Sequence, residues 1–378
     1  MPIQSYSNEM KEMQPIQGAP IGSANTSIII NGIDYNFCST LGGRGQIGCA
    51  GFYTSGNADT EVLVKEDKPG TCLAEGMAII YSPPGQQKMD ESIIQASVGI
   101  VLRDGVRTVA SIQARYSQAE NEEIMPFDIY LLGHKRDPNT FSSEESRNKS
   151  AIIEKISKLP VDVKMQLANA IYTSQLNGDE SLHTGQFMIS INKNTQDVSS
   201  IRRIDFGALG RYGLARDQFD PLHTSRQYAR SGQFHKDYVS YLLDDETVRK
   251  RVLKLWATTN TEDVVNAVGV RFDNQVACLG GPLKDNALKE FDLELTKRTS
   301  FTLSGVKDIQ TQVREHLIQA TRSRCRGMKA SASSHISEII AMSVTIAAQR
   351  AFKDAAQDLR SEIVTSCHPT TEKSTRQP

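Results

Sequence analysis

The sequence lacks an excess of charge of either sign, since 43 lysines and arginines stand against 44 aspartates and glutamates in 378 residues. A formal net charge of −1 gives no global basic field that would draw the chain to nucleic acid, and no acidic excess typical of a solvating tail. Any electrostatic argument must therefore come from local groups of charged residues.

The sequence also lacks the cysteine spacings of metal or disulfide frameworks, and it lacks long apolar runs. Its six cysteines include no Cys-x-x-Cys pair and no cysteine and histidine cluster at metal-ligand spacing, so we expect reduced thiols and a cytosolic working compartment. No stretch approaches the roughly 20 apolar residues that span a bilayer, and the N-terminus lacks a basic segment followed by an apolar one. Any membrane contact is expected to be peripheral.

The chain divides by pattern into a β-rich part and a helical part, which indicates an α+β fold. Residues 1–25 have no periodicity and are expected to be a mobile leader, and residues 26–125 alternate as strands do, giving about five strands and one helix. Three hairpins are predicted in this domain, with turns at Asn31-Gly32, at Gly56-Asn57 and at Arg103-Asp104-Gly105.

The helix of the first domain is predicted over residues 71–81. Leu73, Met77 and Ile80 form one helical stripe, and the Pro83-Pro84-Gly85 run is expected to end the helix. A short packed helix therefore separates the second predicted hairpin from the third.

Residues 126–335 form the predicted helical domain, which a hairpin over residues 185–207 interrupts. A terminal helix is expected over residues 336–366 and a polar tail over residues 367–378, because the tail cannot bury enough surface to fold alone. The stretches with helical spacing of apolar residues in the domain are 143–159, 161–176, 234–259 and 289–325.

A glycine-rich stretch joins the first two hairpins and holds Gly43, Gly45 and Gly48. Glycines let backbone N–H groups approach phosphate oxygens without a Cβ in the way. A dinucleotide-binding loop would need a helix directly afterwards, and a strand is predicted there. A P-loop would need Gly-Lys-Ser or Gly-Lys-Thr at its end, which is absent. The alternatives left are a phosphate cradle and a flexible hairpin.

A lysine follows in the next hairpin. Lys65 lies in a predicted strand, where most lysines simply point to water. After a glycine loop, a strand lysine can instead neutralise the phosphates of a nucleotide, held in place by a helix glutamate. Glu75 on the following helix is the candidate partner, and Glu91 is the second choice.

The third element is the tripeptide Asp205-Phe206-Gly207, which follows a β-prone run. A carboxylate in this setting binds Mg²⁺ that bridges nucleotide phosphates. Upstream, the stretch LNGDESLHTGQ holds Asp179 and His183 where a catalytic loop is expected. The alternatives are that Asp179 is a turn residue and that His183 is a loop histidine with ordinary hydrogen bonds.

The order of these elements resembles the protein-kinase-like superfamily. The stretches LVKED, CLAEGMAII, LNGDESLHTGQ and RIDFG are similar to those of atypical kinases that intracellular bacterial pathogens inject into host cells, and the loop shares features with phosphoinositide kinases. The resemblance covers roughly Thr26 to Arg216 and lies in the ordered combination. It implies a two-lobed fold, with a small antiparallel β lobe and a larger helical lobe.

The resemblance also implies a role for each candidate residue. Lys65 would contact the phosphates of ATP, Glu75 would orient Lys65, and Asp205 would bind Mg²⁺ or Mn²⁺. Asp179 or His183 would lie near the attacking hydroxyl, as general base or as positioning group. The glycines at positions 43, 45 and 48 would cover the phosphates.

The sequence departs from the family pattern at two positions of the catalytic loop. Gln186 occupies the place of a metal-binding asparagine, and Ser181 occupies a place where phosphoinositide kinases have an aspartate. The extra methylene of glutamine displaces the amide oxygen, and such a displacement can lower a rate about a hundredfold. Weak activity, a need for an activator, and loss of catalysis all stay open.

Basic residues gather in three runs of the helical part. They are either solvated helix faces or, if they converge, one site for an anion such as a phosphoinositide headgroup or an inositol polyphosphate. Aromatics make up 6% of the chain and do not interleave these runs, which disfavours nucleic acid. The runs comprise Arg226, Arg230, His235 and Lys236, then Arg249, Lys250, Arg251 and Lys254, then Arg322, Arg324, Arg326 and Lys329.

The resemblance thus implies an ATP- and metal-dependent phosphotransferase, an effector delivered into a host cell. It would act on a host protein or a phosphoinositide, in the host cytoplasm or on host membranes, and inositol hexakisphosphate would be a possible activator. The main alternative is a pseudokinase that binds a nucleotide or a partner without turnover. A further alternative is transfer of AMP on the same fold.

Overall fold

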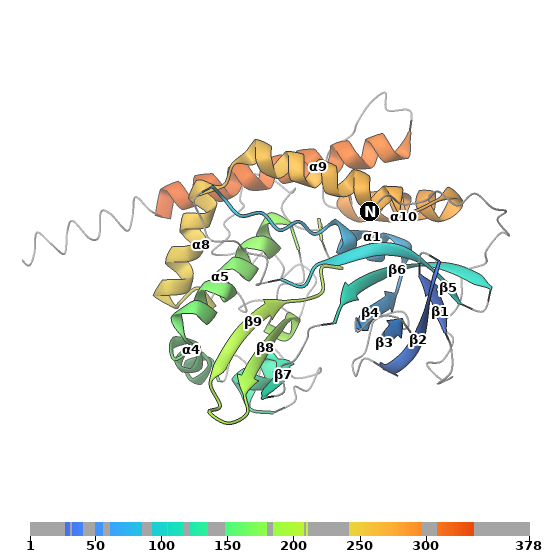
Figure 1. The fold of residues 1–378 in the computed structure, drawn as a ribbon. Helices are drawn as coiled ribbons and strands as arrows, with labels where there is room; N and C mark the ends of the chain where they lie inside the picture. Colours follow the sequence, from blue (N-terminus) through green and yellow to red (C-terminus); the bar gives the residue numbers. More distant parts are fainter. Residues whose placement is uncertain are drawn as a thin grey trace, which may run out of the picture. The chain divides into compact units, whose positions relative to one another are not determined.

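In a computed structural model of the protein, two compact units are distinguished, residues 1–329 and residues 330–378. The structure describes residues 27–30, 32–40, 50–55, 61–84, 93–103, 105–115, 121–134, 148–179, 184–207, 209–210, 242–296 and 308–335. The fold mixes helices with antiparallel strands, as the sequence predicts (Figure 1).

Six strands close into a barrel in the order β1-β2-β3-β4-β6-β5, one strand more than the number expected from the sequence. The three predicted hairpins are confirmed as antiparallel pairs. Gly32 and Gly105 take φ values of +82° and +78° at two of the turns, a conformation that favours glycine. The strands are β1 (Ile28–Ile30), β2 (Ile33–Thr40), β3 (Ala50–Ser55), β4 (Glu61–Glu66), β5 (Ala96–Arg103) and β6 (Val106–Ala114).

The barrel encloses an apolar core to which Ile28, Tyr53, Val64 and Val101 contribute buried side chains. Successive side chains of a strand point to opposite faces, so the inward position of Val64 turns its neighbour Lys65 to the outside of the barrel. The strand pattern therefore places a cation on the outer face of β4.

Helix α1 (Pro69–Met77) packs against β5, β6 and the later helices α9 and α10. The prediction that it extends over residues 71–81 is wrong at its end, because the helix stops at Met77, well before Pro83. The side chain of Asn177 explains this stop. Its Oδ1 accepts from the backbone N–H of Ile79 at 2.9 Å, and its Nδ2 donates to the Ile79 carbonyl at 2.9 Å.

A second sheet contains β7 (Glu122–Pro126), β8 (Phe187–Asn192) and β9 (Val198–Arg203), in that order. The β8–β9 pair confirms the hairpin predicted over residues 185–207, whereas β7 was not predicted. The segment after α1 reaches this sheet, since the backbone N–H of Ile94 donates to the Arg203 carbonyl at 3.0 Å. This contact holds the segment between α1 and β5 against the end of β9.

The helices follow the predicted periodicity with four exceptions. The predicted helix over residues 234–259 is interrupted at residues 243–245, and α8 begins at Glu246, after the N-cap Asp245. Helices α2 and α9 were not predicted, and the predicted stretch 289–325 is divided, since α10 ends at Thr296 and the next helix occupies residues 309–335. The predicted terminal helix over residues 336–366 and the polar tail lie outside the described residues. The helices are α2 (Phe127–Leu132), α4 (Lys149–Ser157), α5 (Val161–Leu176), α8 (Glu246–Thr258), α9 (Thr261–Ala277) and α10 (Gly281–Thr296).

Two of the helix starts have a clear chemical cause. Asp245 accepts hydrogen bonds from the first turn of α8, and Asn260 does the same for α9. Helix α5 is buried over most of its length, which explains why its apolar residues surround the helix instead of forming one stripe. Within the described residues, no helix is long and apolar enough to cross a membrane.

Gly70 provides a test of the packing between α1 and α10. A Cβ at this position would lie 2.6 Å from Glu290 Cβ and 2.8 Å from the Phe291 backbone nitrogen. We expect Gly70→Ala to lower the free energy of unfolding by about 1–3 kcal/mol through overpacking. Urea denaturation measures this loss. Gly280→Ala is the matched control, because no atom lies within 4 Å of its added Cβ, and an equal loss in both variants would contradict the close packing.

Candidate functional site

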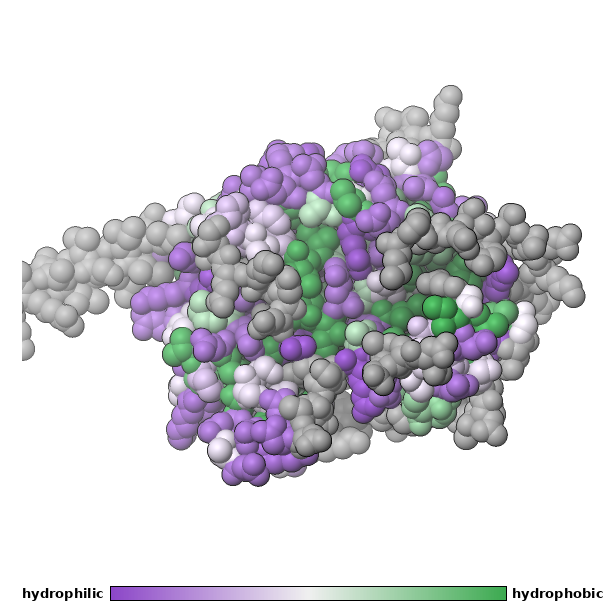
Figure 2. Space-filling view, viewed as in Figure 1, coloured by the Kyte–Doolittle hydropathy of each residue, from purple (hydrophilic) through white to green (hydrophobic). Residues whose placement is uncertain are grey.

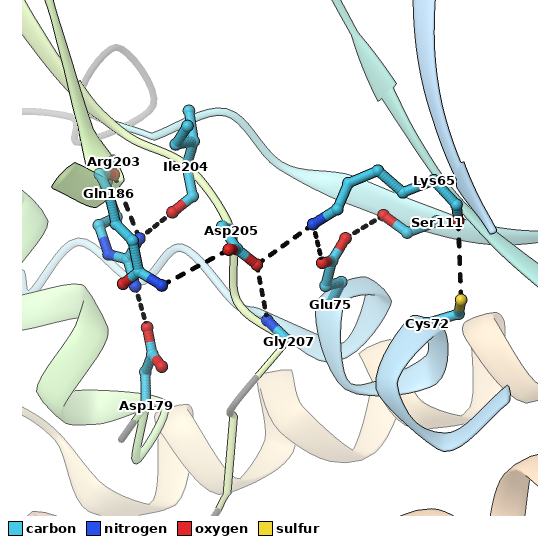
Figure 3. Close-up of polar contacts among 10 residues, drawn as sticks. All are labelled: Lys65, Cys72, Glu75, Ser111, Asp179, Gln186, Arg203, Ile204, Asp205 and Gly207. Atoms are coloured by element: carbon cyan, nitrogen blue, oxygen red, sulfur yellow. Dashed lines mark hydrogen bonds and ion pairs between the residues drawn. The ribbon is translucent and has the colours of Figure 1, made fainter. Parts of the chain in front are cut away.

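Three of the predicted site residues come together between the barrel, α1 and the end of β9. The Lys65 ammonium forms an ion pair with Glu75 and lies 3.2 Å from Asp205 Oδ1 (Figure 3). These residues lie 10 and 140 positions apart from Lys65 in the sequence. The sequence indicates only the order of these three residues along the chain. In the structure they are in contact, and they come from β4, from α1 and from the segment after β9.

The strand register explains how Lys65 and Glu75 meet. Lys65 pairs with Ser111 across β4 and β6, so both side chains lie on the face of the barrel that α1 covers. Glu75 is buried on the facing side of α1, and it accepts hydrogen bonds from both Lys65 and the Ser111 hydroxyl. A buried carboxylate is thus held by a cation and a hydroxyl from neighbouring strands.

Asp205 reaches the site through an unusual backbone conformation. Its φ is +63°, in the left-handed region, which aspartate tolerates better than most residues. The Gly207 N–H donates to its Oδ1 at 3.3 Å, and the next side chain, Phe206, is buried at 1% exposure. Phe206 anchors the tripeptide in the core while the Asp205 side chain keeps 41% of its surface exposed.

The two carboxylates of the site differ in their electrostatics. Burial raises the pKa of the Glu75 carboxyl to about 7 against the opposing effect of Lys65. Burial also acts to raise the pKa of Asp205, but the positive charges of Lys65 and Arg203 outweigh it and hold this pKa well below its usual range. Asp205 is therefore ionised at neutral pH, whereas Glu75 titrates near neutral pH.

Sequence reasoning missed Arg203, which lies two residues before Asp205. Its guanidinium is fully buried at 0% exposure, pairs with Asp179, and donates to the carbonyls of Gln186 and Ile204. It also lies over the Phe187 and Phe206 rings, at 5.7 Å and 4.9 Å from their centroids. The sequence feature that could have identified it is an arginine two residues after Ile201, which places both side chains on the buried face of β9.

Asp179 and Gln186 also lie at this site. Asp179 is 1% exposed and directs its carboxylate to Arg203. The Gln186 amide nitrogen lies 3.5 Å from Asp205 Oδ2, so this amide stands beside the predicted metal ligand. The role of Asp179 as a general base and that of Gln186 as a metal ligand stay predictions.

Several candidate residues fall in parts of the chain that the structure leaves undescribed. They include the three glycines of the glycine loop, the second-choice partner Glu91, and two residues of the catalytic loop. Four residues of the first basic run lie outside the described ranges as well. These positions are Gly43, Gly45, Gly48, Glu91, Ser181, His183, Arg226, Arg230, His235 and Lys236.

The prediction of basic surface runs is wrong for two of their members. Arg251 is 7% exposed and its Nε donates to the Asn169 side chain, and Arg324 is 1% exposed and its Nε donates to the Leu176 carbonyl. Both arginines hold neighbouring helices to α5, so neither faces solvent as a surface anion site requires.

Other members of these runs have acidic neighbours. Lys250 pairs with Glu246 one turn earlier on α8, and Arg322 pairs with Glu262 of α9. Such pairs are typical of solvated helix faces. An anion site formed by the remaining members of these two runs stays a prediction. These members are Arg249, Lys254, Arg326 and Lys329.

The residues present fit a nucleotide-bound divalent cation. Mg²⁺ prefers oxygen ligands and is commonly held by one or two protein groups together with substrate phosphates. An ionised, partly exposed carboxylate at Asp205 beside the Gln186 amide supplies such groups. Among the described residues, no cluster of three or more acidic, histidine or cysteine side chains forms a cation cage, so phosphates would have to complete the coordination.

No family model matches the chain, and no curated protein matches it. Solved structures similar to it include the proinflammatory kinase CtkA of Helicobacter pylori, with a TM-score of 0.42 and 14% identity over 78% of this chain and 96% of that one. The HipA, HipB and operator DNA complex of Shewanella oneidensis MR-1 gives 0.40 and 13% over 86% and 69%. The PAN3 pseudokinase of Neurospora crassa gives 0.26 and 10% over 96% and 77%. At these low values the likenesses decide nothing about activity.

Replacing Asp179 tests whether its carboxylate is structural. Asp179→Asn would leave the Arg203 charge buried without its counter-charge, and we expect a loss of about 3–5 kcal/mol in the free energy of unfolding. Urea denaturation measures it. Glu262→Gln, which removes a carboxylate from an exposed ion pair, should change stability by less than about 1 kcal/mol. Equal stability of Asp179→Asn and the wild type would show that Arg203 does not depend on Asp179.

The raised pKa of Glu75 predicts a pH dependence of stability. The folded protein holds a proton on Glu75 up to about pH 7, whereas the unfolded chain releases it near 4.5. The stabilisation is thus complete below the pKa of Glu75 in the unfolded chain, and it is lost as the pH rises through the pKa of Glu75 in the folded protein. Relative to Glu75→Gln, the free energy of unfolding of the wild type should fall by roughly 1–3 kcal/mol between about pH 5 and pH 8.

The matched control for this measurement is Glu123→Gln, because Glu123 is an exposed glutamate of β7. Its unfolding curve should follow that of the wild type at every pH. A constant difference between wild type and Glu75→Gln across the whole pH range would contradict the burial of an ionisable Glu75.

Proposed function

We propose that the protein is an ATP- and divalent-metal-dependent phosphotransferase with a kinase-like arrangement of two lobes. The barrel with α1 would form the small lobe, and the β7–β9 sheet with the remaining helices would form the larger one. The observation that carries the proposal is the contact of Lys65 with both Glu75 and Asp205. In protein kinases the lysine–glutamate pair and the metal-binding aspartate must both be in place for phosphoryl transfer.

Lys65 would neutralise the phosphates of the bound nucleotide. An ammonium has three donors, and in this structure Glu75 and Asp205 accept from it. The third N–H is then available to a phosphate oxygen, and the Glu75 pair limits the rotation of the side chain. Glu75 therefore acts by orienting Lys65, and its burial between α1 and the barrel strengthens this ion pair.

Asp205 and Gln186 would hold the metal ion. When bound, a divalent cation neutralises the charge that develops on the transferred phosphoryl group. Asp205 contributes an ionised carboxylate, and Gln186 can present its amide oxygen by rotation of the terminal amide. The left-handed backbone at Asp205 and the buried Phe206 fix where this carboxylate points.

One face of the molecule carries an apolar surface that would suit a nucleotide base. Figure 2 shows a band of hydrophobic residues on the viewed face, between the part that carries α5 and the part that carries the barrel, with hydrophilic residues around it. Ligand sites typically combine apolar walls with a few placed polar groups. Such a band would supply an apolar wall for a nucleotide base.

The second candidate function is a pseudokinase-like module that binds a nucleotide or a partner without turnover. Two observations favour it. Gln186 replaces the family asparagine, and Asp179 is committed to the buried pair with Arg203 instead of facing Asp205. Because the Asp179 carboxylate is paired with Arg203, His183, which lies outside the described residues, is the other candidate for the general base.

The setting and the acceptor are proposals that rest on the sequence resemblance. We propose an effector that acts in a host cell on a host protein or a phosphoinositide, with peripheral membrane contact. Activation by an inositol polyphosphate would have to use the outward-facing basic residues, because Arg251 and Arg324 are buried. Transfer of AMP is a further reaction open to the same nucleotide site.

Phosphotransfer by the purified protein tests the proposal. With labelled ATP and Mn²⁺, with and without inositol hexakisphosphate, we expect incorporation of label that falls about a hundredfold or more in Asp205→Ala, because the metal loses its carboxylate. Intact mass distinguishes a phosphate from AMP. Asp197→Ala is the matched control, since Asp197 is exposed at the turn between β8 and β9.

Nucleotide binding separates the two candidate functions. Binding of ATP and Mn²⁺ without label transfer in either condition would favour the binding module. Equal labelling by the wild type and Asp205→Ala would contradict a catalytic role of this site.

A further inference from the structure

Helix α1 is held at both ends by side chains from α9 and α10. At its start, Glu290 Oε2 accepts from the backbone N–H of Gly70 at 2.8 Å. At its end, Arg271 Nε donates to the Gly76 carbonyl at 2.7 Å, and Arg271 Nη2 donates to the Ala96 carbonyl of β5. Glu290 and Arg271 thus satisfy backbone groups that the helix itself leaves unpaired.

These contacts have the correct sign for the helix dipole. A carboxylate is favourable at a helix N-terminus and a cation at the C-terminus. Helix α1 has nine residues, and its own N-cap residue, Lys68, provides no side-chain hydrogen bond. Isolated helices shorter than about 12–15 residues are marginal in water. The end caps from α9 and α10 therefore supply what the sequence of α1 lacks.

The fit between α1 and its neighbours is also close. A Cβ at Gly76 would lie 2.8 Å from Gln275 Oε1 of α9 and 3.0 Å from the Val98 backbone nitrogen. That same Gln275 oxygen accepts from the Val98 N–H at 2.7 Å, which fixes α9 to β5. Figure 1 shows α1 beside the barrel and near α9 and α10, in agreement with its packing contacts. Helix α1 has little room to shift along this surface.

We propose that Arg271 and Glu290 are positioning residues that keep α1 in the orientation in which Glu75 pairs with Lys65. Glu75 precedes Gly76, so the Arg271 hydrogen bond acts on the peptide next to the site carboxylate. The lysine–glutamate pair is then assembled by the chain itself, without an activating partner that moves α1. This inference rests on the proposed function for its consequence in catalysis, but its structural part stands on the contacts alone.

Arg271→Gln tests the proposal, with Arg314→Gln as the matched control. Arg314 lies on the helix that begins at residue 309, and its guanidinium pairs with Asp273 of α9, the helix that also carries Arg271. In Arg271→Gln we expect amide exchange over residues 72–77 to accelerate at least about tenfold, with little change in α5.

The kinetic readout is a fall in kcat of about tenfold to a hundredfold, since displaced positioning groups affect the chemical step, with KM changed much less. Arg271→Lys should keep part of the activity, because it retains the charge and one donor. Glu290→Gln gives an independent variant should Arg271→Gln fold poorly, and it should loosen the first turn of α1.

The outcomes distinguish this inference from the proposed function. Unchanged amide exchange over residues 72–77 in Arg271→Gln and Glu290→Gln, or amide exchange that accelerates equally throughout the molecule, would overturn the positioning role. Faster amide exchange confined to α1 in these variants, but not in Arg314→Gln, would support it, even for a protein that binds nucleotide without turnover. Absence of phosphotransfer in the wild type bears only on the proposed function.

Discussion

The structure of the site depends on one partly buried cation. The Lys65 ammonium stands between Glu75 and Asp205, which come from α1 and from the segment after β9. Without it, two carboxylates would face each other in a region of low dielectric, where like charges repel strongly. Because burial of a charge is unfavourable unless it is paired, the position of each of the three groups constrains the other two. The pairing thereby couples the barrel, α1 and the second sheet.

A second buried cation does the same on the other side of Asp205. Arg203 joins Asp179 and the Ser174 hydroxyl at the end of α5 to the carbonyls of Gln186 and Ile204. Its guanidinium has five donors in a fixed planar array, which suits simultaneous contacts with several segments better than a lysine would. Asp205 thus lies between two cations, and both lower its pKa.

The sequence is most informative where the signal is local. The turns at Gly32 and Gly105 and the order of Lys65, Glu75 and Asp205 could be read from short stretches. The end of α1 could not, because it depends on the Asn177 side chain, 98 residues later than Ile79. For a related reason, Arg251 and Arg324 were mistaken for surface charge, and Arg203 was missed. Arg203, Arg251 and Arg324 find their partners on other elements, and composition alone does not reveal them.

The distances along the chain show which part of the fold determines the site. The barrel hairpins pair residues that are close in sequence, whereas Gly70 meets Glu290 across 220 residues and Arg271 meets Gly76 across 195. A fragment with the barrel and α1 would carry Lys65 and Glu75 but none of the side chains that cap α1. Non-local contacts of this kind require large loops to close before they stabilise anything. The geometry of the lysine–glutamate pair is therefore a property of the chain through α10, and not of the barrel that carries the lysine.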